Sequence, residues 1–149
     1  RLLDSYQQNR SFKPFFNELL GLWAFKQNER GSVRIVKKGD KMLHELRIYH
    51  CAPGKLPALN NRFETITLKL WESHGIRPIG FWTVAIGPDN NCLYYLLEWD
   101  NLAERDQKWN KFATDPEWIK AKASTEVDGV LAPRIENMIL APTAYSKIR

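Results

Sequence analysis

Three side chains that could act together on a substrate, Glu45, Arg47 and Tyr49, occupy alternate positions in residues 43–51. Side chains alternate between the two faces of a β-strand, so these three share one face if this segment is a strand. A buried guanidinium binds a carboxylate through two parallel hydrogen bonds, and a phenol and a carboxylate beside it can orient a small polar substrate. Because buried charges are usually paired, an internal ion pair that fixes the strand register is the alternative.

Aromatic side chains form a second candidate group. Tyr95 and Trp99 alternate with Tyr94 and Glu98 in residues 92–99, and Trp82 lies in the apolar run before them. One of the two alternating sets should line an interior space, where aromatic walls suit a flat organic ligand, and close sheet-to-sheet packing is the alternative. We therefore expect Glu45, Trp82, Tyr95 and Trp99 to contact a substrate that Arg47 and Tyr49 orient.

Proton transfer needs a titratable group near such a space, and His74 and Glu98 are the candidates. His74 ends a predicted helix, where a protonated imidazole interacts favourably with the helix dipole. His44 and His50 share a strand face but are too far apart to chelate a metal. Because the chain lacks H-x-x-x-H and C-x-x-C spacings, it predicts no protein-built metal site and no cofactor. It also lacks a nucleophile elbow, a phosphate loop and a dinucleotide fingerprint, which argues against hydrolases, kinases and Rossmann dehydrogenases.

The elements that must position these groups follow one another in the order strand, helix, strand, strand, helix, strand. Strands are predicted over residues 43–51, 79–87, 92–99 and 134–140 from alternating and β-branched or aromatic patterns. Apolar residues spaced by three and four predict a helix over 55–74, with Gly75 as its C-cap. Asn101 and Asp115 each begin a second helical region as N-caps.

This order predicts an α+β domain of the ferredoxin-like β-α-β-β-α-β type, with helices covering one face of a four-stranded antiparallel sheet. The other face also carries apolar side chains, and a second copy of the chain is the usual source of cover. We expect Leu46 and Ile48 to lie under the helices and Glu45, Arg47 and Tyr49 to face the space between two sheets. Whether that space is hollow or packed stays open.

The first 41 residues differ from the rest of the chain in charge. They carry nine Lys/Arg and four Asp/Glu, whereas residues 42–149 carry thirteen of each, so the whole net charge of +5 lies in the extension. The neutral body is not a nucleic-acid binder by charge. Helical spacing of Phe and Trp predicts an amphipathic helix over 12–25, and a short strand fits Val33 and Ile35. This extension is a docked helix, the remnant of another domain or a processed import region.

The length of 149 residues suits one domain at 42–149 plus this extension, and two cysteines are too few for a disulfide framework. No run approaches the roughly 18 apolar residues of a membrane span. We expect a cytoplasmic protein, with a mitochondrial one as the alternative.

Several ordered segments resemble the NIPSNAP family. Residues 44–49 (HELRIY) and 53–55 (PGK) resemble its opening strand and turn, and residues 72–75 (ESHG), 79–82 (IGFW) and 86–87 (IG) resemble its first helix end and second strand. Residues 102–105 (LAER) and 115–118 (DPEW) resemble its second helical region. No single segment is specific, but the ordered set over about 43–146 is.

The resemblance implies a dimeric α+β barrel, in which two sheets pack face to face around a central space. Related barrels include cofactor-free oxygenases, cyclases, isomerases and haem-handling proteins, so haem enters by analogy alone. One hypothesis is a cofactor-independent enzyme acting on an aromatic or polyketide-like compound, with Arg47, Tyr49, His74 and Glu98 as its catalytic group. The other is a non-catalytic homodimer that binds a protein or membrane partner through its N-terminal helix.

Overall fold

The computed structural model describes residues 23–27, 33–37 and 42–148, and the chain divides into two units, 1–40 and 41–149. The first unit contains β1 (Trp23–Gln27) and β2 (Val33–Lys37), which pair in antiparallel fashion. The strand expected around Val33 and Ile35 is therefore confirmed. The helix predicted over 12–25 is wrong for its last three residues, which belong to β1, and residues 12–22 lie outside the described part of the chain.

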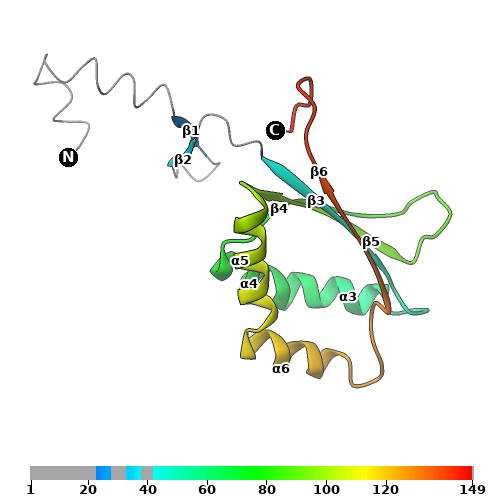
Figure 1. Cartoon of the computed structure of the whole chain (residues 1–149). Helices are drawn as coiled ribbons and strands as arrows, with labels where there is room; N and C mark the ends of the chain where they lie inside the picture. Colours follow the sequence, from blue (N-terminus) through cyan, green and yellow to red (C-terminus); the bar gives the residue numbers. More distant parts are fainter. Residues whose placement is uncertain (1–22, 28–32, 38–41, 149) are drawn as a thin grey trace, which may run out of the picture. The chain divides into compact units, whose positions relative to one another are not determined.

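The second unit is built on a four-stranded antiparallel sheet with the order β4-β5-β3-β6 (Figure 1). Its strands are β3 (Leu43–His50), β4 (Arg77–Thr83), β5 (Cys92–Trp99) and β6 (Arg134–Leu140). The central strand β3 pairs with both β5 and β6, so the first and third strands of the unit lie side by side in the middle of the sheet. This is the ferredoxin-like arrangement that the order of the elements predicted.

The first helical region runs without a break from α3 (Leu56–Arg62) through the π-helical turn η2 (Phe63–Thr67) to α4 (Leu68–His74). The chain leaves it at Gly75, whose φ of 68° lies in the left-handed region that favours glycine. The helix predicted over 55–74 is thus confirmed, although the apolar spacing gave no sign of the π-helical turn.

The second helical region consists of α5 (Leu102–Ala113) and α6 (Pro116–Thr125). Asn101 caps α5, since its side-chain oxygen accepts a hydrogen bond of 2.9 Å from the backbone N–H of Glu104. Asp115 caps α6 in the same way, accepting a bond of 2.7 Å from the backbone N–H of Glu117. Both predicted helix starts are confirmed.

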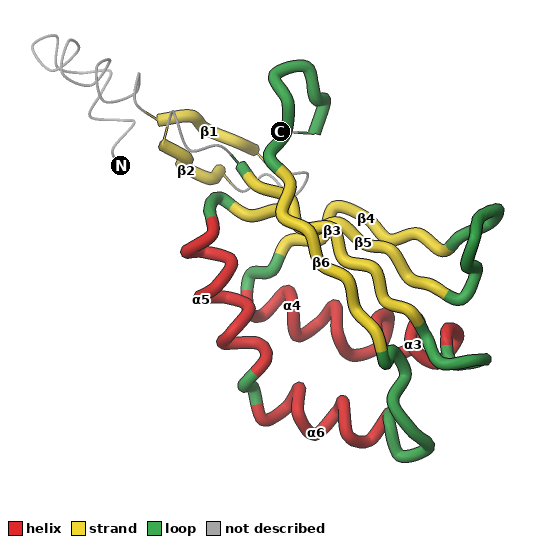
Figure 2. The backbone as a smooth tube through the Cα atoms, turned by 45° about the vertical axis from the view of Figure 1, so that its right-hand side comes forward, coloured by secondary structure: helices red, strands yellow, loops and turns green. Residues whose placement is uncertain are grey.

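All the helices of the second unit lie on one side of the sheet (Figure 2). The core between them and the sheet is dominated by the odd-numbered side chains of β5 and the apolar side chains of the helices. Its fully buried members include Leu59, Trp71, Tyr95, Leu97 and Trp99. The described residues contain no helix that is long and apolar enough to cross a membrane.

The even-numbered side chains of β3 and β5 point to the uncovered face of the sheet. The expected orientation of β3 is therefore wrong: Glu45, Arg47 and Tyr49 pair with Leu97, Tyr95 and Leu93 and lie beneath the helices, while Leu46 and Ile48 face away from them. The sheet register decides this, because the odd-numbered side chains of β5 supply the larger apolar surface.

Candidate ligand-binding site

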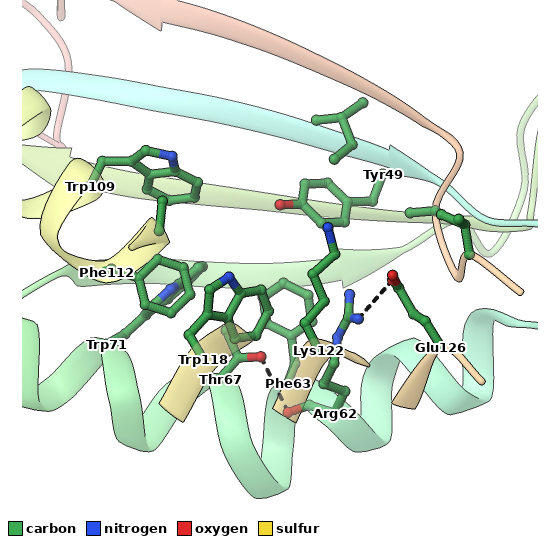
Figure 3. A pocket seen from close by; sticks show the side chains of 14 residues that line it. Tyr49, Arg62, Phe63, Thr67, Trp71, Trp109, Phe112, Trp118, Lys122 and Glu126 are labelled. Atoms are coloured by element: carbon green, nitrogen blue, oxygen red, sulfur yellow. Dashed lines mark hydrogen bonds and ion pairs between the residues drawn. The ribbon is translucent and has the colours of Figure 1, made fainter. Parts of the chain in front are cut away.

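A cavity of about 180 Å³ lies between the helices and the sheet. For comparison, an apolar cavity of about 150 Å³ can hold a benzene molecule. Its wall comes from β3, β6, all the helices of the unit and the α6–β6 loop (Figure 3). The lining residues are Tyr49, Arg62, Phe63, Thr67, Trp71, Trp109, Phe112, Ala113, Trp118, Lys122, Glu126, Val130, Ala132 and Ile135.

The π-helical turn η2 forms one wall of this cavity. An α-helix has about 3.6 residues per turn, so side chains spaced by four drift steadily around its surface. Phe63, Thr67 and Trp71 are spaced by four, yet all three line the cavity. The wide turn takes up the drift, and the Thr67 hydroxyl marks it by donating to the carbonyl of Arg62, five residues back, at 3.3 Å. Single π-helical turns within α-helices often occur at functional sites.

Two cationic side chains meet the phenol of Tyr49 at the cavity. The side chains of Arg62, Lys122 and Tyr49 point towards one another across it (Figure 3). Arg62 is 3% exposed and holds Glu126 through a 2.9 Å bond from Nη1 to Oε1. The ammonium of Lys122 has no carboxylate within ion-pair distance in the part of the chain that the structure describes. The Lys122 side chain is exposed, so its unpaired positive charge borders solvent as well as the cavity.

Buried hydrogen-bond donors of the lining residues also lack acceptors. The indole N–H of Trp71 and the Nε–H of Arg62 are buried without a partner among the described residues. An unsatisfied buried donor costs about 1–3 kcal/mol. These two donors lie behind the surface of the cavity, so a ligand could reach them only if the side chains shifted.

Glu45 and Arg47 lie behind the cavity and do not line it. The Glu45 carboxylate is fully buried and accepts bonds of 2.8 Å from Arg47, 3.1 Å from both Nε and Nη2 of Arg105, and 3.0 Å from the indole of Trp99. Burial alone would raise its pKa, but the bonds from Arg105 and Arg47 outweigh burial and hold the pKa of Glu45 below its usual range.

Arg47 connects this network to the cavity wall. Its Nη2 donates to the Tyr49 hydroxyl at 3.4 Å, and its guanidinium lies 4.2 Å from the ring centroid of Trp109. Of the trio predicted to orient a substrate, only Tyr49 lines the cavity. The structure thus favours the internal ion pair that was the alternative reading for Glu45 and Arg47.

The comparison with known proteins decides the family. The NIPSNAP sequence profile matches residues 44–147, which is most of the chain. The chain belongs to the NIPSNAP family. It is 29% identical over 79 residues to human protein NipSnap homolog 3A and 28% identical over 82 residues to mouse protein NipSnap homolog 3B. These matches cover 53% and 55% of the chain, but they span only 31% and 32% of those relatives.

Solved structures of bacterial NIPSNAP proteins share the fold of this domain. A NIPSNAP-like domain protein from Burkholderia xenovorans is 26% identical, with a TM-score of 0.64 over 72% of this chain and 90% of its own. A NIPSNAP family protein from Agrobacterium tumefaciens is also 26% identical, with a TM-score of 0.65 over 72% of this chain and 99% of its own. The family and the ferredoxin-like fold expected from the sequence are therefore confirmed.

Apart from His74, the remaining predicted site residues lie at two separate places in the NIPSNAP domain. Tyr95 and Trp99 are fully buried core residues, whereas Trp82 is 53% exposed on the uncovered sheet face, opposite Tyr94. Glu98 shares that face and lies 3.4 Å from Nε of Arg77. A single site made of all these residues is therefore excluded, and their individual roles in binding or catalysis stay predictions.

His74 joins two helices. Its Nε2 lies 2.7 Å from the carboxylate of Asp115, the residue that caps α6. The hydrogen bond from His74 and the backbone N–H of Glu117 lower the pKa of Asp115. Because His74 is not among the cavity-lining residues, its proposed proton transfer has no support from the geometry of the described chain.

Sequence reasoning missed the polar residues of the cavity, although one signal was present. Trp118, Lys122 and Glu126 are spaced by four, so they share one face along α6 and its C-cap. Arg62 and Thr67 gave no such signal, because their five-residue separation matches neither helical spacing of three nor of four. A partner-binding helix near the N-terminus and a cytoplasmic location remain predictions.

Proposed function

We propose that this NIPSNAP domain binds a small, flat organic anion in the cavity between its helices and its sheet. The observation that carries the proposal is the ammonium of Lys122, which has no carboxylate partner among the described residues and lies with Arg62 and the Tyr49 phenol at a pocket with aromatic walls. A carboxylate or enolate oxygen would pair with that ammonium. Aromatic walls with a few polar groups are typical of small-molecule sites.

The volume limits the size of this ligand. A cavity of about 180 Å³ suits a single aromatic ring with one acidic substituent rather than a fused polyketide. Of the two substrate classes that the sequence suggested, the geometry supports the small aromatic one.

Acid–base chemistry is the reaction type that these side chains can perform. Lys122 and Arg62 can stabilise an enolate or another developing oxyanion through their positive charges. The Tyr49 hydroxyl, which accepts from Arg47, can return a proton to the substrate. A cofactor-independent isomerase or cyclase fits these groups better than the oxygenase that the sequence left open.

A matched pair of ligands and a matched pair of variants test the binding proposal. Benzoate and the neutral benzamide are titrated into the full chain by NMR. Because Lys122 is exposed, an ion pair with it contributes about 0.2–1 kcal/mol, so Lys122→Gln should weaken benzoate binding by up to about fivefold and leave benzamide binding nearly unchanged. Lys120→Gln is the control, because Lys120 is also exposed on α6 but does not line the cavity. The proposal fails if benzoate shifts no cavity resonances, or if both variants bind it equally.

We propose further that two copies of the domain pair through the uncovered sheet face. That face carries several apolar side chains although no helix of the described chain covers it, and three of them, Trp82, Met138 and Leu140, are 41–53% exposed. A two-fold pairing of the same face on two copies would cover it. Its apolar members are Leu46, Ile48, Trp82, Tyr94, Leu96, Met138 and Leu140.

Light scattering coupled to size exclusion tests this pairing. Leu96 lies on an interior strand directly opposite Leu46, so Leu96→Glu would bury two carboxylates between the sheets and should give a monomer. Ile86→Glu, in the β4–β5 loop where the side chain is 99% exposed, should leave the dimer intact. A wild-type chain that stays monomeric at tens of micromolar would refute the pairing without bearing on the cavity.

A further inference from the structure

Three side chains with metal-binding atoms meet at one end of the uncovered sheet face. His50 ends β3, Cys92 begins β5, and Asp89 lies in the loop before β5. The antiparallel register places His50 directly opposite Cys92, so both side chains project from the same face. His50 lies 39 and 42 residues before the other two, which explains why the sequence shows no compact metal-ligand motif.

The ligand atoms form a compact triangle. The Cys92 sulfur lies 3.1 Å from Nδ1 of His50 and 3.0 Å from Oδ2 of Asp89, and the latter two atoms are 3.3 Å apart. Around a tetrahedral Zn²⁺ with ordinary bond lengths, sulfur, nitrogen and oxygen ligands lie about 3.4–3.6 Å from one another. An opening of a few tenths of an ångström would admit the ion, and the half-exposed loop residue Asp89 can move by that much.

The second ring nitrogen of His50 is held by a carboxylate. Nε2 lies 2.7 Å from Oε1 of Glu136 on β6, and a proton on Nε2 would make this bond and leave the lone pair on Nδ1. Metal-binding histidines almost always donate their other N–H to such a partner, which fixes the ring and its tautomer. Glu136 therefore directs the lone pair of Nδ1 towards Cys92 and Asp89.

Nδ1 of His50 has more neighbours than one lone pair can serve. In addition to Cys92 and Asp89, Nη2 of Arg134 lies 2.9 Å from it. The Arg134 side chain is 64% exposed, so it can swing into solvent. The guanidinium thus occupies the nitrogen that a metal ion would need.

We propose that His50, Asp89 and Cys92 bind a divalent transition metal ion of the Zn²⁺ type, with one coordination position left for a further ligand. The combination of thiolate, imidazole and carboxylate favours Zn²⁺ and Co²⁺ over Mg²⁺ and Ca²⁺, which prefer oxygen ligands alone. Glu136 positions the histidine, and Arg134 competes with the ion. The metal site lies on the opposite face of the sheet from the cavity. The metal-site proposal does not depend on the function proposed for the cavity.

Titration of the reduced full chain with Co²⁺ tests the site, since a thiolate ligand gives a sulfur-to-cobalt charge-transfer band in the near ultraviolet. One equivalent should produce the band, and Zn²⁺ should abolish it. Cys92→Ser should remove the band, whereas Cys51→Ser, at the only other cysteine of the chain, should keep it. No band in the wild type, or a band that Cys51→Ser removes and Cys92→Ser retains, overturns the proposal.

Variants outside the buried core keep the test decisive if Cys92→Ser does not fold. Asp89→Asn, in the exposed loop, should weaken Co²⁺ binding at least tenfold, and Glu136→Gln should weaken it about 10- to 100-fold. Arg134→Gln should strengthen binding, because it removes the competing charge. Unchanged affinity in Asp89→Asn overturns the assignment, and so does weaker binding in Arg134→Gln.

Discussion

Glu45→Gln should destabilise the domain strongly, because the Glu45 carboxylate joins β3 to α5. It accepts hydrogen bonds from Arg47, Arg105 and Trp99 at 2.8–3.1 Å and is fully buried. Both carboxylate oxygens are acceptors in this network, whereas a glutamine side chain offers one oxygen and one NH₂. The variant would place two donors face to face, leave the Arg47 guanidinium without its counter-ion and leave Arg105 with the exposed Asp106 alone.

The size of the effect follows from burial. Removing one partner of a buried ion pair costs about 3–5 kcal/mol, since the other charge stays buried. Glutamine keeps part of the hydrogen bonding, so we expect about 3 kcal/mol. For a domain of this size, 1 kcal/mol shifts the midpoint of thermal unfolding by about 4 °C, which gives a decrease of about 12 °C.

Asp106→Asn is the matched control, because Asp106 bonds the same Arg105 at 3.1 Å but its side chain is 65% exposed. Exposed ion pairs contribute about 0–1 kcal/mol, so the control should unfold within a few degrees of wild type. Thermal and urea unfolding followed by circular dichroism give both values. Equal stability of the two variants would refute the structural role of Glu45, and substrate binding would then be its remaining predicted role.

The same variant should change the dependence of stability on pH. The folded-state pKa of Glu45 is lowered, so the stability it provides is complete above the unfolded-state pKa of about 4.3 and is lost as pH falls through the folded-state value. The deficit of Glu45→Gln should therefore be full at pH 7 and shrink on acidification below pH 4. If the difference in unfolding free energy between Glu45→Gln and wild type stayed constant down to pH 2, the lowered pKa of Glu45 would be contradicted.

Three further variants test the elements that carry the sites. Asn101→Ala should cost about 1 kcal/mol in urea unfolding, because it removes the N-cap of α5. Gly75→Ala should cost about 1 kcal/mol, since its φ of 68° disfavours a side chain. Leu59→Ala should cost about 2–5 kcal/mol, because Leu59 is fully buried in the core; stability within 1 kcal/mol of wild type would contradict its place there.

Local sequence signals predicted most of the secondary structure. Residues 92–99 and 134–140 are strands within the predicted bounds, and the caps Asn101 and Asp115 begin helices as expected. These features depend on neighbouring residues, through alternation, turn chemistry and hydrogen bonds to the first backbone N–H groups. The fold of the domain could be predicted because the order strand, helix, strand, strand, helix, strand is typical of the ferredoxin-like fold.

The direction of β3 failed because it depends on residues far away in the chain. Both faces of the strand carry apolar and polar side chains, and the prediction assumed that charges avoid the helices. Arg105, 60 residues beyond Glu45, supplies the charge that makes burial of the carboxylate acceptable. The odd-numbered side chains of β5 are the more apolar set, which indicates the face that the helices cover. This fact fixes the direction of β3 only when the register that pairs Arg47 with Tyr95 is known.

The two faces of the sheet separate the proposed activities of this domain. Lys122 and Tyr49 belong to the cavity on the helix side, while His50 and Cys92 project from the opposite side of the same strands. Distant sites without shared partners have nearly additive effects, so Lys122→Gln should leave Co²⁺ affinity unchanged and Cys92→Ser should leave benzoate affinity unchanged. Coupling of more than about threefold in either direction would mean that β3, which contributes Tyr49 to one site and His50 to the other, transmits metal binding to the cavity.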